Sequence, residues 1–282
     1  MAGKTVVVTG ASSGIGFETA RALAANGARI VMVVRNRDKG DAAIGKIKAE
    51  SPEAELGLVL ADLYSLAEVR RAGAEIRDRE KRVDVLVNNA GLIHQRRELT
   101  VDGFERTFAL NHLAAFLISY ELRELLAAGA PSRIVTVSSF GHHFARFSWD
   151  DLATASRSWG ETTSYSTSKL CNIWFARESA RRLAGRKVTS NALHPGAVGS
   201  NFGASGSWFY KLGIQVAKPL LLSPQKGART SIYLASSPEV AETTGEYFVR
   251  CKVATPSRRA RDDDSARRLW ELSEKLCEVA WP

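Results

Sequence analysis

The chain has 282 residues, of which 45% are hydrophobic and 24% are charged, and its formal net charge is +9. This composition excludes a disordered chain and supports one folded domain over residues 1–282. No apolar run approaches the roughly 20 residues of a membrane helix, and the N-terminus lacks a secretory pattern. We therefore expect a cytoplasmic protein without a membrane span.

The positive charge does not predict a nucleic-acid site. The 39 lysines and arginines are spread along the chain, and their one dense cluster, at 258–261, is followed at once by three aspartates. We expect the field to attract an anionic small ligand instead. Cys171, Cys251 and Cys277 are an odd, widely spaced set that predicts reduced thiols, with neither a disulfide framework nor a metal site.

Short β-branched runs alternate with longer amphipathic stretches along the whole chain. Seven runs predict strands, at Thr5–Thr9, Arg29–Val34, Leu56–Leu60, Val83–Asn88, Arg133–Ser138, Lys187–Leu193 and Glu246–Val249. Helical patterns between them include Gly14–Ala25, Leu66–Arg79, Asn111–Ala128 and Ser166–Leu183. Because solidly apolar strands are buried on both faces, the sequence predicts an α/β fold: a doubly wound (Rossmann-type), mainly parallel seven-stranded sheet with helices on both faces.

Two long stretches interrupt this alternation, at 140–163 and at about 197–222. Long loops beyond strand ends usually carry function in such folds. The second stretch contains Trp208, Phe209 and Tyr210. We interpret it as a substrate loop whose aromatic residues form a lid over an apolar substrate, and a merely folded loop is the alternative.

A glycine-rich turn follows the first predicted strand and opens the first helix: Gly10, Ala11, Ser12, Ser13, Gly14, Ile15 and Gly16. Glycines at this place allow a tight turn and let the backbone approach a pyrophosphate, whose charge then lies on helix N–H groups. Ordinary β–α turns also use glycine, but the position between a strand and a helix favours a dinucleotide site.

The residues after the second predicted strand bear on which dinucleotide binds. An acidic residue there would bind the ribose 2′-hydroxyl of NAD, whereas arginine would accept the 2′-phosphate of NADP. Arg35, Asn36 and Arg37 follow the strand, and Asp38 is interpreted as the N-cap of a helix that begins near Lys39. We therefore predict NADP(H) in preference to NAD(H). Further along the chain, Asp62 and Leu63 either contact the adenine or belong to a helix cap.

Tyr165 and Lys169 stand four residues apart and therefore on one face of a helix. A tyrosine phenol has a pKa near ~10, so proton exchange at neutral pH needs a neighbouring positive charge. A solvated surface pair is the alternative interpretation. Ser139 and the Asn88–Gly91 segment favour a catalytic pair, because both come at the ends of buried strands, at the sheet edge where ligands bind in open α/β folds.

Together these motifs resemble the short-chain dehydrogenase/reductase family. The matching residues occur in the family's order: Thr9–Gly16, Asn88–Gly91, Asn111, Ser139, Tyr165, Lys169 and His194-Pro195-Gly196. Further motifs resemble the retinol dehydrogenase-like branch: Asn111-His112-Leu113, Asp150-Asp151-Leu152 and Leu269-Trp270-Glu271-Leu272-Ser273. The resemblance covers almost the whole chain.

The resemblance implies a role for each matched position. Tyr165 would be the general acid in carbonyl reduction and the base in alcohol oxidation, and Lys169 would lower the pKa of that phenol and hold the nicotinamide ribose. Ser139 would hydrogen-bond the substrate oxygen, and Asn111 would fix a water that links Lys169 to solvent. The cofactor would contact Gly10, Ser12, Ser13, Gly14, Ile15, Gly16, Arg35, Asn36, Arg37, Asp62, Leu63, Asn89, Ala90, Gly91, Tyr165, Lys169, Pro195, Gly196, Val198 and Ser200.

We therefore predict an NADP(H)-dependent oxidoreductase that interconverts a carbonyl and an alcohol on a small, fairly apolar substrate by hydride transfer. A catalytically silent NADP(H)-binding scaffold or sensor is the alternative. The adjacent His142 and His143 predict no metal site, because neighbouring side chains point in different directions. The apolar faces of the helices predicted at Asn111–Ala128 and Ser166–Leu183 predict a homodimer or homotetramer.

Overall fold

The central element of the fold is an eight-stranded sheet, seen in a computed structural model that describes residues 1–198 and 221–281. The strands are β1 (Thr5–Thr9), β2 (Arg29–Val34), β3 (Leu56–Leu60), β4 (Val85–Asn88), β5 (Ser132–Val137), β6 (Val188–His194), β7 (Tyr247–Val249) and β8 (Lys252–Val253). Their order is β3-β2-β1-β4-β5-β6-β7-β8. The chain winds outward from β1 to β3 and then returns to the other side of β1, which is the doubly wound arrangement that the sequence predicted.

Strands β1 to β7 are parallel, which confirms the predicted seven strands with boundaries that differ by at most two residues. The antiparallel β8 was not predicted. Arg250 and Cys251 form its hairpin turn with φ angles of +52° and +61°. Hairpin turns with positive φ usually carry Asn or Gly, so this turn lacks the expected sequence signal.

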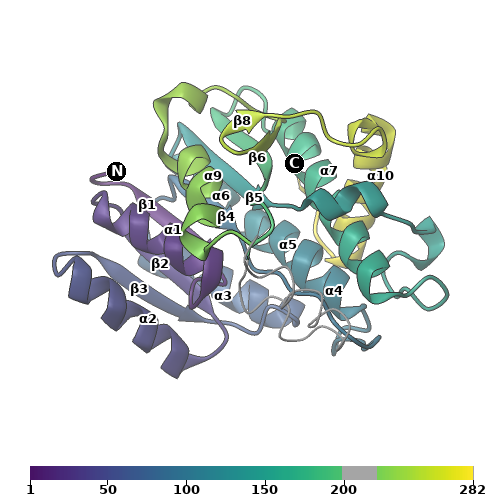
Figure 1. Cartoon of the computed structure of the whole chain (residues 1–282), viewed down its shortest axis with the longest axis horizontal. Helices are drawn as coiled ribbons and strands as arrows, with labels where there is room; N and C mark the ends of the chain where they lie inside the picture. Colours follow the sequence, from purple (N-terminus) through teal and green to yellow (C-terminus); the bar gives the residue numbers. More distant parts are fainter. Residues whose placement is uncertain (199–220, 282) are drawn as a thin grey trace.

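The helices cover both faces of the sheet (Figure 1). Their bounds are α1 (Gly14–Ala25), α2 (Arg37–Glu50), α3 (Leu66–Arg79), α4 (Arg106–Phe108), α5 (Ala114–Glu121), α6 (Arg123–Ala128), α7 (Glu161–Arg182), α9 (Pro224–Ser236) and α10 (Asp263–Leu276). The hydrophobic core on one face involves α1, α2 and α9, and the core on the other involves α3, α5 and α7. Strand β1 serves both cores, because Val6 and Val8 point into the first and Val7 into the second.

The helix predicted at Asn111–Ala128 is wrong in its bounds. The helical segment begins at Arg106, passes through a π-helical turn at Ala109–Leu113 and is interrupted at Leu122 between α5 and α6. Its start is fixed by Glu105, whose carboxylate accepts a hydrogen bond from the Phe108 amide at 2.9 Å. Asn111 therefore lies inside a π-helical turn, a feature that is frequent at functional sites.

Helix α7 begins at Glu161, one turn before the predicted Ser166, and α10 packs along it. Trp270 of α10 stacks on Phe175 of α7 with ring centroids 5.9 Å apart, and Trp281 packs against Phe116 of α5 at 5.7 Å. The apolar faces that suggested an oligomer are therefore covered within the same chain. The homo-oligomer stays a prediction, without that support.

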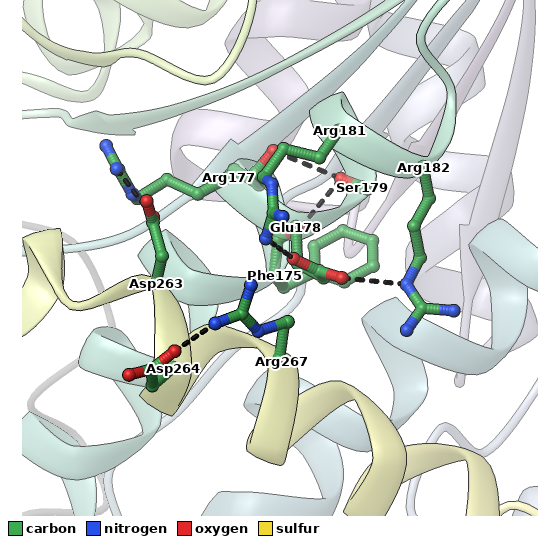
Figure 2. Close-up of polar contacts among 10 residues, drawn as sticks. Phe175, Arg177, Glu178, Ser179, Arg181, Arg182, Asp263, Asp264 and Arg267 are labelled. Carbon is green, nitrogen blue, oxygen red and sulfur yellow. Dashed lines mark hydrogen bonds and ion pairs between the residues drawn. The ribbon is translucent and has the colours of Figure 1, made fainter.

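Figure 2 shows charged side chains near the contact between α7 and α10: the Arg177–Asp263 ion pair joins the two helices, whereas the Glu178 pairs lie within α7 and the Asp264–Arg267 pair lies within α10. Arg177 of α7 lies 2.8 Å from Asp263 at the first turn of α10, and the buried Glu178 accepts hydrogen bonds from Arg181 and Arg182, both at 2.8 Å.

None of the helices within residues 1–198 and 221–281 is long and apolar enough to cross a membrane.

Candidate active site

A cavity of about 810 Å³ opens at the carboxyl ends of the parallel strands. It lies where the winding direction of the sheet reverses, the usual ligand position in such folds. Most predicted site residues line it: Gly10, Ser12, Ser13, Gly14, Ile15, Gly16, Arg35, Asn36, Asp62, Leu63, Asn89, Ala90, Gly91, Ser139, Tyr165, Lys169, Pro195, Gly196 and Val198. Arg37 and Asn111 are not among the described lining residues, and Ser200 lies outside the described part of the chain.

The glycine-rich turn is held against the end of β4. Gly10 has a φ of +67°, which only glycine adopts readily. A Cβ atom on Gly16 would lie 2.5 Å from the Gly10 carbonyl oxygen and closer still to the Asn89 amide nitrogen. Asn89 in turn donates to the Thr9 carbonyl at 2.8 Å. The first residues of α1, Gly14, Ile15 and Gly16, line the cavity, and the N–H groups at a helix N-terminus suit a pyrophosphate.

After β2, the start and the N-cap of the next helix differ from the prediction. Helix α2 begins at Arg37, and its N-cap is Asn36, whose side-chain oxygen accepts from the Lys39 amide at 2.9 Å. The predicted cap, Asp38, lies in the first turn instead, because asparagine caps as well as aspartate and stands nearer the strand. Arg35 lines the cavity, and so does Lys39, which the sequence analysis did not select.

The two interpretations of Asp62 and Leu63 are also separated. The N-cap of α3 is Ser65, whose hydroxyl accepts from the Glu68 amide, so neither residue is the helix cap. Both line the cavity together with Tyr64. The cap alternative is therefore wrong, and adenine contact stays a prediction.

Ser139, which follows β5, and Tyr165 and Lys169 of α7 line the cavity together, and a Cβ atom on Gly141 would lie 3.4 Å from both the Ser139 Oγ and the Tyr165 ring. The hydroxyl of the adjacent Ser138 donates to the Lys169 carbonyl at 2.6 Å and is buried. Lys169 is almost fully buried, its Nζ donates to the Val137 carbonyl at 3.0 Å, and it lies 5.7 Å from the centre of the Tyr165 ring. Burial lowers the pKa of Lys169 to about 7. A bound anion or phenolate would restore its charged form.

Asn111 lies behind this cluster and ties two elements together. Its amide oxygen accepts from the Leu92 amide at 2.9 Å, and its Nδ2 donates to the Leu92 carbonyl at 3.0 Å and to Ser168 of α7 at 2.9 Å. A Cβ atom on Gly91 would lie 3.1 Å from both the Asn111 Oδ1 and the Lys169 Nζ. Asn111 therefore fixes the segment after β4 against the helix that carries Tyr165.

The described start of the predicted substrate loop lies beside the cavity. Val198 lines the cavity, as do Pro195 and Gly196 just before the loop, and the Leu222 amide at the end of the loop donates to the Ala197 carbonyl at 2.7 Å. The predicted aromatic lid, Trp208, Phe209 and Tyr210, lies outside the described residues.

Sequence reasoning missed several lining residues. Phe140, Phe144 and His194 line the cavity beside Ser139 and Tyr165. Phe140 and Phe144 lie in the 140–163 stretch, whose aromatic content was the available signal. His194 directly precedes the Pro195-Gly196 turn, but nothing in its local sequence shows which way its ring points.

Comparisons with known proteins show which proteins this chain is similar to. A family model described as short chain dehydrogenase matches residues 4–207. Retinol dehydrogenase 14 of Homo sapiens is 42% identical over 302 aligned residues, covering 98% of this chain and 87% of that protein. A solved structure of a Mycobacterium paratuberculosis protein covers 100% of this chain and 96% of its own, with a TM-score of 0.81 and 35% identity. The RhlG/NADP active-site complex of Pseudomonas aeruginosa covers 88% of this chain and 94% of its own, with a TM-score of 0.71 and 25% identity.

The chain belongs to the short-chain dehydrogenase/reductase family, as its motifs predicted. It is an NAD(P)-dependent oxidoreductase that acts on CH–OH groups and is similar to the retinol dehydrogenases.

Proposed function

We propose that this enzyme uses NADP(H) and interconverts a carbonyl and an alcohol on a fairly apolar molecule, with Tyr165 as the general acid and base. The observation that carries the proposal is the meeting of Ser139, Tyr165 and Lys169 in the cavity that the glycine-rich turn also lines. Ser139 supplies a hydrogen-bond donor, Tyr165 a transferable proton and Lys169 a buried amine, and the reaction needs all three.

The residues present fit a phosphorylated dinucleotide. The turn packs closely against Gly16, and the backbone N–H groups at the start of α1 would bind a pyrophosphate. Arg35 and Lys39 line the cavity after β2, where the 2′-phosphate would lie, and supply two positive charges. The NADP complex of the Pseudomonas aeruginosa relative supports the same choice. When bound, the cofactor supplies the hydride chemistry, and the protein supplies geometry and proton transfer.

In the reducing direction, Ser139 donates a hydrogen bond to the substrate oxygen while negative charge develops there. Tyr165 then gives that oxygen its phenolic proton. The Lys169 ammonium, close to the Tyr165 ring, stabilises the phenolate that remains. In the oxidising direction the same phenolate takes the alcohol proton.

The substrate would be apolar because aromatic side chains border the reacting groups. Phe140 and Phe144 line the cavity and expose 54% and 61% of their surface, although large apolar groups usually avoid water. A hydrocarbon-rich substrate would cover them. The similarity to retinol dehydrogenases supports this class.

The test has two stages. Quenching of tryptophan fluorescence by NADPH and by NADH gives the two dissociation constants, and oxidation of NADPH is then followed against apolar aldehydes, ketones and quinones. We expect tighter binding of NADPH, turnover of at least one apolar carbonyl, and loss of turnover in Tyr165→Phe with unchanged NADPH affinity. Equal or better catalytic efficiency with NADH would refute the cofactor preference, and tight binding without turnover would favour a silent scaffold.

A further inference from the structure

The peptide bond that follows Ser139 is held from both sides by imidazole rings. His142 Nδ1 lies 2.7 Å from the Ser139 carbonyl oxygen, and the Phe140 amide donates to His194 Nδ1 at 3.2 Å. The carbonyl and the amide belong to one planar unit and point in opposite directions. This peptide plane therefore has little freedom to rotate about its ends.

The hydrogen bonds fix which nitrogen of His142 carries the proton. The Ser257 amide donates to His142 Nε2 at 3.0 Å, so Nε2 presents its lone pair and the hydrogen of the neutral ring lies on Nδ1. The Nδ1–H then donates to the Ser139 carbonyl. The ring is 1% exposed, and burial lowers the pKa of His142 to about 4, so the neutral form persists at physiological pH. Its neighbour His143 is exposed.

The second partner of His142 comes from a distant part of the chain. Ser257 belongs to the segment between β8 and α10, beyond residue 207, where the family match ends. The same segment is anchored at two further points: Arg259 donates to the Ala145 carbonyl at 2.7 Å, and Trp174 of α7 donates to the Arg259 carbonyl at 2.9 Å. The ring of His142 thus joins the C-terminal region to the end of β5.

We propose that His142 is a positioning residue for Ser139. Its Nδ1 binds the carbonyl of the peptide that follows Ser139, and its Nε2 binds the Ser257 amide, so that the C-terminal segment fixes the position of the ring. The inference rests on the proposed function, in which Ser139 binds the substrate oxygen. The Ser139 hydroxyl accepts from the Gly141 amide at 3.1 Å, so its direction follows the turn that begins with this peptide plane. A rotation of the plane would move the hydroxyl relative to Tyr165.

Two substitutions separate the two bonds of the ring. His142→Asn places an amide nitrogen near the Nδ1 position and keeps a donor for the Ser139 carbonyl, but it gives up the Ser257 bond. His142→Gln places an amide oxygen near the Nε2 position and keeps the acceptor for Ser257, but it gives up the side-chain bond to the Ser139 carbonyl, which then keeps only the longer bond from the His142 backbone amide, 3.2 Å. Asparagine also leaves the larger cavity, so it is expected to be no more stable than glutamine.

We expect His142→Gln to lower kcat by about tenfold or more, because small misplacements of a catalytic group are costly, while KM and the NADPH dissociation constant change by less than about threefold. His142→Asn should retain kcat within about threefold of the wild type. His143→Asn and His143→Gln are the matched controls and should leave kcat unchanged. Thermal midpoints of all four variants show whether activity merely follows stability, in which case Asn would be the worse variant.

Equal kcat losses in the Asn and Gln variants, or no loss in Gln, would overturn the positioning role. A wild-type enzyme without turnover would instead contradict the proposed function. The geometry has a test that needs no turnover: ring nitrogen chemical shifts of His142 in the NADPH-bound protein should report the Nδ1–H form. An Nε2–H or doubly protonated ring at pH 7 would refute the inference in either case.

Discussion

Gly16 and Gly45 form a matched pair that measures how tightly the cofactor turn is packed. Both lie inside helices, Gly16 in α1 and Gly45 in α2. A Cβ atom on Gly45 would meet nothing within 4 Å, whereas a Cβ atom on Gly16 would lie 2.5 Å from the Gly10 carbonyl oxygen. Gly45 is in the middle of α2 and Gly16 is the third residue of α1, so alanine gains no more helix propensity at Gly16 than at Gly45, and the two positions differ chiefly in their surroundings.

The expected free energies follow from these distances. Alanine favours a helix interior over glycine by about 1 kcal/mol, so Gly45→Ala should stabilise the protein by up to that amount. At Gly16 a gain no larger than this is opposed by overpacking, about 1–3 kcal/mol, and by disturbance of the Asn89 hydrogen bond, about 1 kcal/mol. The Gly10 carbonyl must retreat by about 1 Å to reach an ordinary contact distance. Gly16→Ala should therefore be about 2–4 kcal/mol less stable than Gly45→Ala.

Urea unfolding gives both free energies, and a fluorescence titration gives the NADPH dissociation constant of each variant. Displacement of the Gly10 carbonyl should weaken NADPH binding at least about tenfold in Gly16→Ala, with no change in Gly45→Ala. If the Gly16 variant matched the Gly45 variant in stability and in NADPH affinity, the close approach of the turn to α1 would be refuted.

Three further predictions concern affinity, structural support and pH. Arg35→Ala should weaken NADPH binding about tenfold in titrations and leave NADH binding unchanged; Arg37→Ala is the control that should alter neither, because Arg37, unlike Arg35, does not line the cavity, and an unaltered NADPH affinity in Arg35→Ala would contradict a phosphate contact by Arg35. Asn111→Leu leaves the Leu92 amide and carbonyl without their side-chain partner, so urea unfolding should show a loss of about 1–3 kcal/mol, and no loss would refute the bracing role. Burial lowers the pKa of His112 to about 3, so below pH ~6.5 the unfolded chain binds a proton that the folded chain does not, and the unfolding free energy falls as the pH falls. Between pH 6.5 and 5 this fall is about 1.6 kcal/mol. His112→Gln, which retains a donor for Ser273, should abolish that part of the fall, and an identical pH dependence would refute it.

The sheet could be predicted because its physical signal is local. A strand that serves two cores, as Val6, Val7 and Val8 do, must be apolar at every position, and such runs stand out from amphipathic helices. The order of motifs then placed Ser139, Tyr165 and Lys169 at one edge of the sheet. Ser139 directly follows a strand end, and Tyr165 and Lys169 stand four residues apart on a helix; both are local features, so these three residues could be selected from the sequence.

Contacts between distant segments could not be predicted in this way. His142 was assessed only as a possible metal ligand, because its actual partners are the backbone of Ser139 and of Ser257, 115 residues further along the chain. Backbone partners leave no trace in side-chain pattern. The π-helical turn at Ala109–Leu113 could not be predicted for a similar reason, since such a turn preserves the apolar character on which the helix prediction depended.

Helix α7 is enclosed by β5, β6, η2 (Phe140–Phe144) and α10, and most of its length is buried. Backbone amides in so enclosed an element exchange with solvent only through large-scale opening of the molecule. Because NADPH binds the folded and not the opened molecule, it should slow exchange around Tyr165 and Lys169 only by the factor by which it stabilises the whole protein, with no extra protection confined to this segment. Ligand binding would then find the reacting side chains already in place, and the ordering entropy of this helix would already have been lost during folding.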